Sequence, residues 1–150
     1  MTVVDVSSLI VINRSPEVVA AFVADPDSAT SWYNNIESVT WNTAPPLGVG
    51  TRLTFVARFL GRRLEYTYEI AEWVPSRRLV MRTSDGPFAM ETTYTWEPGP
   101  EGGTVMGLRN RGEPSGFSGM VAPAVASALR HANHRDLALL KDVVERATPL

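Results

Sequence analysis

Two histidines, His131 and His134, lie three residues apart in a long segment rich in alanine, leucine and valine. In a helix, this spacing places both imidazoles on neighbouring positions of one face. Either could act as a general base at a cavity. A metal site is not predicted, because no H-E-x-x-H or comparable spacing supplies further ligands. The alternative is that both lie at the polar edge of the helix beside Arg130 and Asp136. His131 is kept as a candidate catalytic residue.

Arg109 is the second candidate catalytic residue, at the end of the last predicted strand. Successive side chains of a strand point to opposite faces of the sheet. A register that turns Leu108 and Asn110 inward turns Arg109 and Arg111 outward, and we favour this register. A bulge at Gly107 would reverse it, and Arg109 could then bind a carboxylate or stabilise an enolate inside a cavity.

Large apolar side chains recur with a period of two in the predicted strands, so they share one face of a sheet. Aromatic residues on such a face form apolar walls, and their O–H and N–H groups can orient an oxygen of a ligand. The alternative is a packed core without a cavity. The predicted ligand-binding residues are Leu53, Phe55, Phe59, Tyr66, Tyr68, Met81, Met90, Tyr94, Trp96, Phe117, Met120, Val121 and Val125.

The segment 112–119 contains a proline and several glycines around Phe117. Mobile loops at the mouths of cavities are typically built from such residues, and Phe117 or Met120 could act as an apolar gate. An ordinary connection between a strand and a helix explains the same composition equally well.

The elements that position these residues alternate in an uneven order. The first strand is followed by two short helices, because Ser15-Pro16 and Asp25-Pro26 each pair a capping residue with a proline. Six further strands follow with short connections, which predicts an antiparallel meander. The expected strands cover residues 3–12, 36–41, 51–60, 64–71, 78–83, 90–97 and 104–111.

A helix is expected from about Phe117 to Ala147, with apolar residues at helical spacing along one broad stripe. At about 1.5 Å per residue it would run roughly 40 Å, long enough to cross the sheet. Pro123 predicts a kink or a start near Ala122. This helix would cover the apolar face of the meander, which must pack on another layer.

The composition describes an ordinary globular protein of one domain, residues 1–150, with 44% hydrophobic residues and a net charge of −2. Proteins that neutralise phosphates show basic stripes, so nucleic acid is not a predicted partner. The chain has no cysteine, which excludes disulfides and thiolate chemistry. No apolar run is long enough to span a membrane and no signal peptide is recognisable. We therefore expect a cytoplasmic protein.

Short motifs occur along the chain in the order and spacing of a known superfamily. They are Ile12-x-x-Ser15-Pro16-Glu17-Val18, Phe22-x-x-Asp25-Pro26, Val49-Gly50-Thr51, Tyr68-x-Ile70-x-Glu72-x-x-Pro75, Tyr94-x-Trp96-Glu97-Pro98 and Asn133-x-x-Asp136-Leu137-x-x-Leu140-Lys141. Together they resemble the START-related superfamily SRPBCC, particularly its bacterial polyketide cyclase/dehydrase-like branch. The resemblance covers nearly the whole chain. It implies an α+β helix-grip fold, in which a curved seven-stranded antiparallel sheet wraps around a long C-terminal helix and two short helices join strands one and two.

Proteins of this superfamily bind lipids, sterols, polyketides and other apolar molecules between sheet and helix, and a minority are aromatase/cyclases. The resemblance therefore implies binding of a small hydrophobic ligand, polyketide-like or lipid-like, by a monomer or homodimer without a cofactor. The alternative is an aromatase/cyclase or dehydratase in which Arg109, His131 or a tyrosine hydroxyl assists proton transfer. A third possibility is a stress or interaction protein with a vestigial pocket. Ionisable groups converging inside the pocket would favour the enzyme.

Overall fold

The computed structural model describes residues 4–59, 61–85, 89–112 and 122–147. Seven antiparallel strands form one sheet in the order β1-β7-β6-β5-β4-β3-β2. The elements are β1 (Val4–Ile12), α1 (Pro16–Ala24), η1 (Pro26–Ser28), α2 (Ala29–Trp32), β2 (Ile36–Trp41), β3 (Arg52–Phe59), β4 (Arg62–Val74), β5 (Arg78–Asp85), β6 (Met90–Pro98), η2 (Pro100–Gly102), β7 (Thr104–Gly112) and α3 (Ala122–Ala147). The helix-grip fold predicted from the sequence is confirmed.

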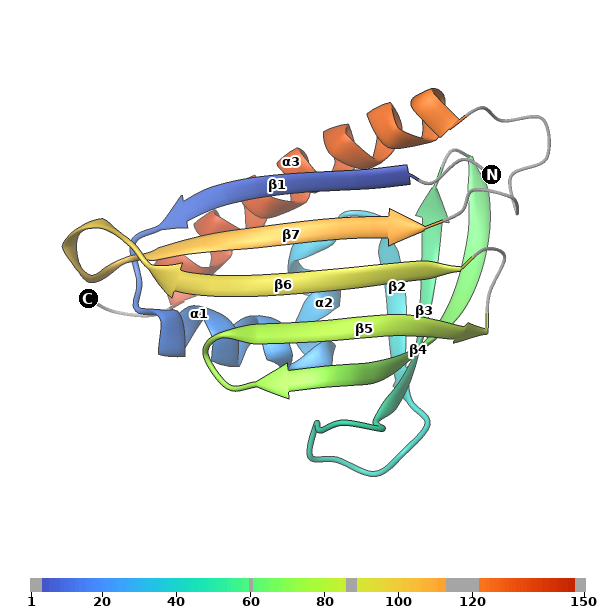
Figure 1. Cartoon of the computed structure of the whole chain (residues 1–150), viewed down its shortest axis with the longest axis horizontal. Helices are drawn as coiled ribbons and strands as arrows, with labels where there is room; N and C mark the ends of the chain where they lie inside the picture. The colour runs from blue at the N-terminus through green and yellow to red at the C-terminus, as the bar shows by residue number, and fades with distance from the viewer. Residues whose placement is uncertain (1–3, 60, 86–88, 113–121, 148–150) are drawn as a thin grey trace.

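The sheet curves strongly, so that β2 and β3 run across the direction of β1, β7 and β6 (Figure 1). β4 carries the chain around this bend, and its pairing with β5 shifts register between Thr67 and Tyr68 and again between Ile70 and Glu72. Such bulges bend a strand and increase its twist. The long helix α3 lies along the concave side, beside β1 (Figure 1). A concave face is thereby placed opposite a helix.

Local sequence accounts for the short helices that close one end of this concave face. Ser15 caps α1 by accepting a hydrogen bond from the Val18 N–H at 3.4 Å, and Pro16 takes the first helical position. Asp25 caps η1 in the same way, because its side chain accepts a hydrogen bond from the Asp27 N–H at 3.1 Å. The second predicted helix is observed as the 3-10 turn η1 followed by α2.

β7 pairs without any register shift on both of its sides, which settles the orientation of its arginines. Met106 and Leu108 are buried, whereas Arg109 is exposed. The outward register of Arg109 that we favoured is therefore confirmed. Gly107 pairs with Leu9 and Thr95 in the regular ladder, so the alternative register, which required a bulge at this glycine, does not occur. A side chain at this position would press on the Thr95 hydroxyl, with its Cβ at 2.5 Å from Oγ1.

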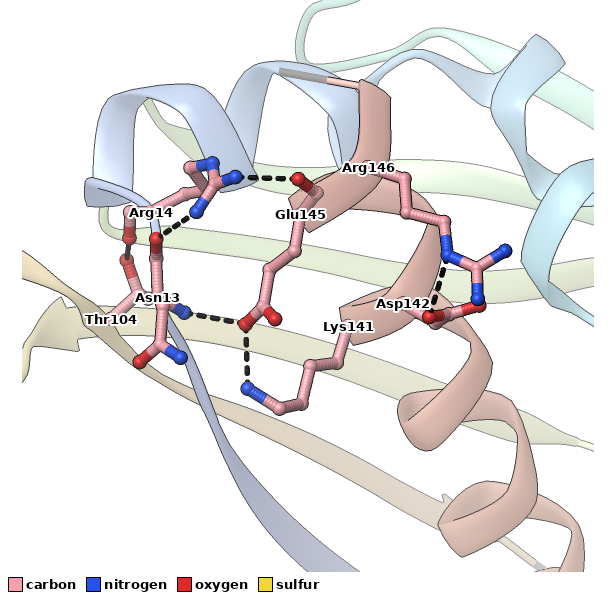
Figure 2. Close-up of polar contacts among 7 residues, drawn as sticks. All are labelled: Asn13, Arg14, Thr104, Lys141, Asp142, Glu145 and Arg146. Carbon is pink, nitrogen blue, oxygen red and sulfur yellow. Dashed lines mark hydrogen bonds and ion pairs between the residues drawn. The ribbon is translucent and has the colours of Figure 1, made fainter. Parts of the chain in front are cut away.

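α3 begins at Ala122 as the structure describes it, with Pro123 in its first turn. Residues 117–121 of the longer predicted helix lie outside the described residues. The C-terminal end of α3 is tied to the turn after β1 through Glu145 (Figure 2). Its carboxylate accepts from the Asn13 N–H at 2.8 Å and from Lys141, and its carbonyl accepts from Arg14. Hydrogen bonds from Lys141 and Asn13 hold the pKa of Glu145 below its usual range.

Candidate functional site

A cavity of about 150 Å³ lies between the concave face of the sheet, the two short N-terminal helices and α3. Its walls are mostly apolar and aromatic, because the strands present one alternating set of side chains to the helix. Seven predicted ligand-binding residues line it, and their part in binding stays a prediction. They are Leu53, Phe55, Tyr66, Tyr68, Met81, Met90 and Tyr94.

Two other predicted residues lie away from the cavity wall. Trp96 is 1% exposed and packs between Tyr94 and Trp73, with ring centroids 6.3 and 6.4 Å away. It belongs to the same buried cluster as Val19 and Val23 of α1. Val125 is buried against Val4 and Val6 of β1. Both side chains therefore belong to the packed core rather than to the wall.

The remaining predicted binding residues cannot be placed by their side chains. Phe59 is the last residue of β3, and the structure describes its backbone but not its side chain. Phe117, Met120 and Val121 lie outside the described residues, and so does the apolar gate that we predicted for Phe117 or Met120.

Neither candidate catalytic residue reaches the cavity wall. Arg109 lies on the outer face of the sheet, where its guanidinium donates to both carboxylate oxygens of Asp5 at 2.8 and 2.6 Å. This bidentate contact holds the pKa of Asp5 below its usual range. His131 is exposed on α3. Their positions follow from strand parity and from the helical period, which turn both away from the concave face.

Among the described lining residues, Asp136 of α3 is the acidic side chain that the structure adds to the cavity wall. The residue is 2% exposed, and its Oδ1 accepts the backbone N–H of Asn34 at 3.1 Å. Burial raises the pKa of Asp136, and the Asn34 N–H and the nearby Arg135 only partly oppose this effect. The carboxyl group therefore sits in a mostly apolar enclosure with one hydrogen bond to its side chain among the described residues.

A pair of phenols lies near this carboxyl group. The hydroxyls of Tyr33 and Tyr94 form a hydrogen bond with each other. Burial raises the pKa of both phenols well above the usual value, and the negative charge of Asp136 adds to this shift. Both tyrosines are therefore neutral over the physiological pH range and act as hydrogen-bonding groups.

A second polar chain crosses from α3 to the sheet. The side-chain amide of Asn133 donates to Asn110 Oδ1 at 2.7 Å, and Asn110 in turn donates to Thr92 Oγ1 at 2.9 Å. The Thr92 hydroxyl also interacts with Tyr68, whose pKa burial raises to about 12. These groups line the cavity and are held by one another, so they form a fixed polar strip on an otherwise apolar wall.

The spacing of residues in α3 could have indicated that Asn133 and Asp136 are buried. Asn133 and Asp136 fall within the buried stripe of α3, which also holds Ala132, Leu137 and Leu140. Polar residues on the buried face of a helix are uncommon and require partners inside the protein. Their position on the stripe, rather than their chemical type alone, distinguishes them from the exposed histidines.

Comparison with known protein families shows the family to which the chain belongs. The model of the family described as polyketide cyclase / dehydrase and lipid transport matches residues 1–145. The chain belongs to this family. No curated protein matches the chain significantly in sequence.

Solved structures share the same fold at low sequence identity. A protein of Thermus thermophilus is 23% identical with a TM-score of 0.82, covering 97% of this chain and 99% of that one. A START superfamily protein of Mycobacterium smegmatis is 16% identical with a TM-score of 0.84, covering 96% and 99%. The Zhui aromatase/cyclase of a Streptomyces species is 17% identical with a TM-score of 0.77, covering 97% and 95%. Such identities support a common fold.

Two further observations concern the part of the chain that the structure describes. None of its helices is both long and apolar enough to cross a membrane. Within the same residues, the histidine and acidic side chains form no group of three or more that could hold a metal ion.

Proposed function

We propose that the chain binds a small, predominantly apolar molecule in the cavity between the sheet and α3. The observation that carries this proposal is the cavity itself, whose wall is built from aromatic, leucine and methionine side chains with few polar groups. Small-molecule sites in proteins are typically concave and apolar, with a small number of placed polar groups. Membership of a family that includes lipid transport supports the same function.

A substitution that fills the cavity tests this proposal. Ala132 lies on the cavity wall, and an indole at this position would occupy the space of a ligand. We expect wild-type protein to bind a neutral environment-sensitive dye saturably, and Ala132→Trp to weaken binding by about tenfold or more, as measured by fluorescence titration. Ala138→Trp adds the same side chain on the exposed side of α3 and should leave the affinity unchanged. Folded wild-type protein that binds no apolar probe would contradict the proposal.

Cyclase or dehydratase chemistry in the same cavity is the second candidate function. One observation favours it, namely that the Asp136 carboxyl and the Tyr33–Tyr94 hydroxyl pair lie together on the wall. A buried carboxyl with a raised pKa is a suitable proton donor or acceptor beside a substrate carbonyl. In this reading Asp136 takes the role that the sequence suggested for Arg109 or His131.

A further inference from the structure

The carboxyl group of Asp136 on the cavity wall has unused capacity to accept hydrogen bonds. A carboxylate offers about four lone-pair positions to donors. Among the described residues, the Asn34 N–H is the one hydrogen-bond donor to the Asp136 side chain, and it binds Oδ1. Leaving the rest of a buried carboxyl without donors costs free energy. A molecule in the cavity that carries a donor would supply the missing hydrogen bond.

The neighbouring polar groups are hydrogen-bonded to other protein side chains. The Tyr33 hydroxyl is paired with that of Tyr94, and the amide of Asn133 is paired with Asn110. These hydrogen bonds hold the groups in place whether or not a ligand is present. Asp136 differs from them because an ionised carboxylate only accepts hydrogen bonds, so it favours a ligand atom that donates one.

The charge of the wall disfavours an anionic ligand. Arg58 is the cationic side chain among the described lining residues, and its side chain is 64% exposed and paired with Glu37. Arg135, next to Asp136 in sequence, is exposed and donates to Asn35. A ligand carboxylate would lie near Asp136 without a buried cation to compensate it.

The size of the cavity limits the ligand as well. An apolar cavity of about 150 Å³ is known to admit a benzene ring. A compact single-ring molecule therefore fits, with its ring against the aromatic side chains of β3 and β4. Phe55, Tyr66 and Tyr68 present their rings there, with the Tyr68 centroid 5.6 Å from that of Phe55 and 6.0 Å from that of Tyr66.

We infer that the cavity selects a compact neutral ligand bearing a hydroxyl group, of the class of phenols or cyclic alcohols, with the hydroxyl donating to Asp136. This inference rests on the proposed binding function and narrows it. It excludes two other classes of apolar ligand: free fatty acids, which are anionic, and plain hydrocarbons, which have no hydrogen-bond donor.

Three probes of nearly equal shape test the inference by calorimetry or dye displacement at neutral pH. They are 4-methylphenol, 4-fluorotoluene, which replaces the hydroxyl with a fluorine, and 4-methylbenzoate, which is an anion. We expect wild-type protein to bind 4-methylphenol about tenfold more tightly than 4-fluorotoluene, the scale of one hydrogen bond to a charged acceptor. The benzoate should bind most weakly.

Two substitutions then locate the preference. Asp136→Leu removes the acceptor and should bring the affinities for 4-methylphenol and 4-fluorotoluene within about threefold of each other. Asp142→Asn removes a carboxylate that is exposed on the same helix and paired with Arg146, and it should keep the wild-type preference. If Asp136→Leu does not fold, Asp136→Asn takes its place and should reduce the preference for 4-methylphenol, because a neutral amide oxygen is a weaker acceptor than a carboxylate.

The possible outcomes separate this inference from the proposed function. Equal binding of phenol and fluorotoluene, lost together in Ala132→Trp, would overturn the inference and leave the binding function standing. Tightest binding of the benzoate would do the same. Failure of all three probes, together with the dye, to bind folded protein would overturn both.

Discussion

Replacing Trp32 with alanine should lower the free energy of unfolding by about 3–5 kcal/mol, as for other fully buried aromatic side chains. Trp32 is 1% exposed at the end of α2, and its ring packs against Tyr33 and against the edge of Tyr94. It also forms part of the cavity wall. Removing it would leave a void at the point where the short helices meet the sheet. Denaturant unfolding followed by circular dichroism measures the change.

A matched tryptophan provides the control for this prediction. Trp41 is only partly buried in β2 and donates a 3.3 Å hydrogen bond to Asp27. Trp41→Ala should therefore cost clearly less than Trp32→Ala. Trp32→Phe should also cost less than the alanine variant, since it keeps an aromatic ring and removes an indole N–H that has no partner among the described residues. Equal losses for Trp32→Ala and Trp41→Ala would contradict this account of the core.

Replacing Asp136 with asparagine should stabilise the protein at neutral pH by about 1–3 kcal/mol, the scale of burying an incompletely paired polar group. Asparagine keeps an oxygen that can accept the Asn34 N–H and has no charge to bury. The change therefore removes the desolvation penalty and retains the observed hydrogen bond. A binding residue that lowers stability is a common compromise between function and folding. Thermal unfolding of both proteins measures the difference.

The stabilisation by Asp136→Asn should depend on pH in a defined direction. Burial raises the pKa of Asp136 in the folded protein above its ordinary value of 3.8. Between the two pKa values the folded protein binds more protons than the unfolded chain, so stability from this group falls as pH rises. The advantage of the variant should thus vanish below about pH 3.8 and reach its full size above the folded pKa. An advantage that grew on acidification would show that Asp136 is stabilised as a charged group.

Period-two patterning predicted the concave face well, because the strands are half buried and the inner strands β3 to β7 have their register fixed by pairing on both sides. Leu53, Tyr66 and Met81 reach the cavity wall for this reason. β7 shows the same logic, since its regular pairing turns Leu108 inward and Arg109 outward.

The polar part of the site could not be predicted in the same way. Asp136 receives a hydrogen bond from Asn34, which is 102 positions away in the chain, and no local pattern encodes that contact. Trp96 has the same parity as Tyr94, yet only Tyr94 lies on the cavity wall. Strand patterning gives the face on which a side chain lies. Whether that part of the face adjoins open space or a packed helix depends on the curvature of the whole sheet.

The order of strands in the sheet has a consequence for how the chain folds. β1 is the first strand to leave the ribosome, yet its partner β7 is the last strand, and its covering helix α3 ends the fold. The hairpins from β2 to β6 can form while synthesis continues, whereas β1 must wait for residues beyond 104. Pairing between segments that are distant in the chain slows folding. The chain between them must first lose conformational entropy, before the new contacts contribute any stabilisation. We therefore expect the pairing of β1 with β7, and the packing of α3, to be late steps of folding, with β1 exposed to aggregation until they occur.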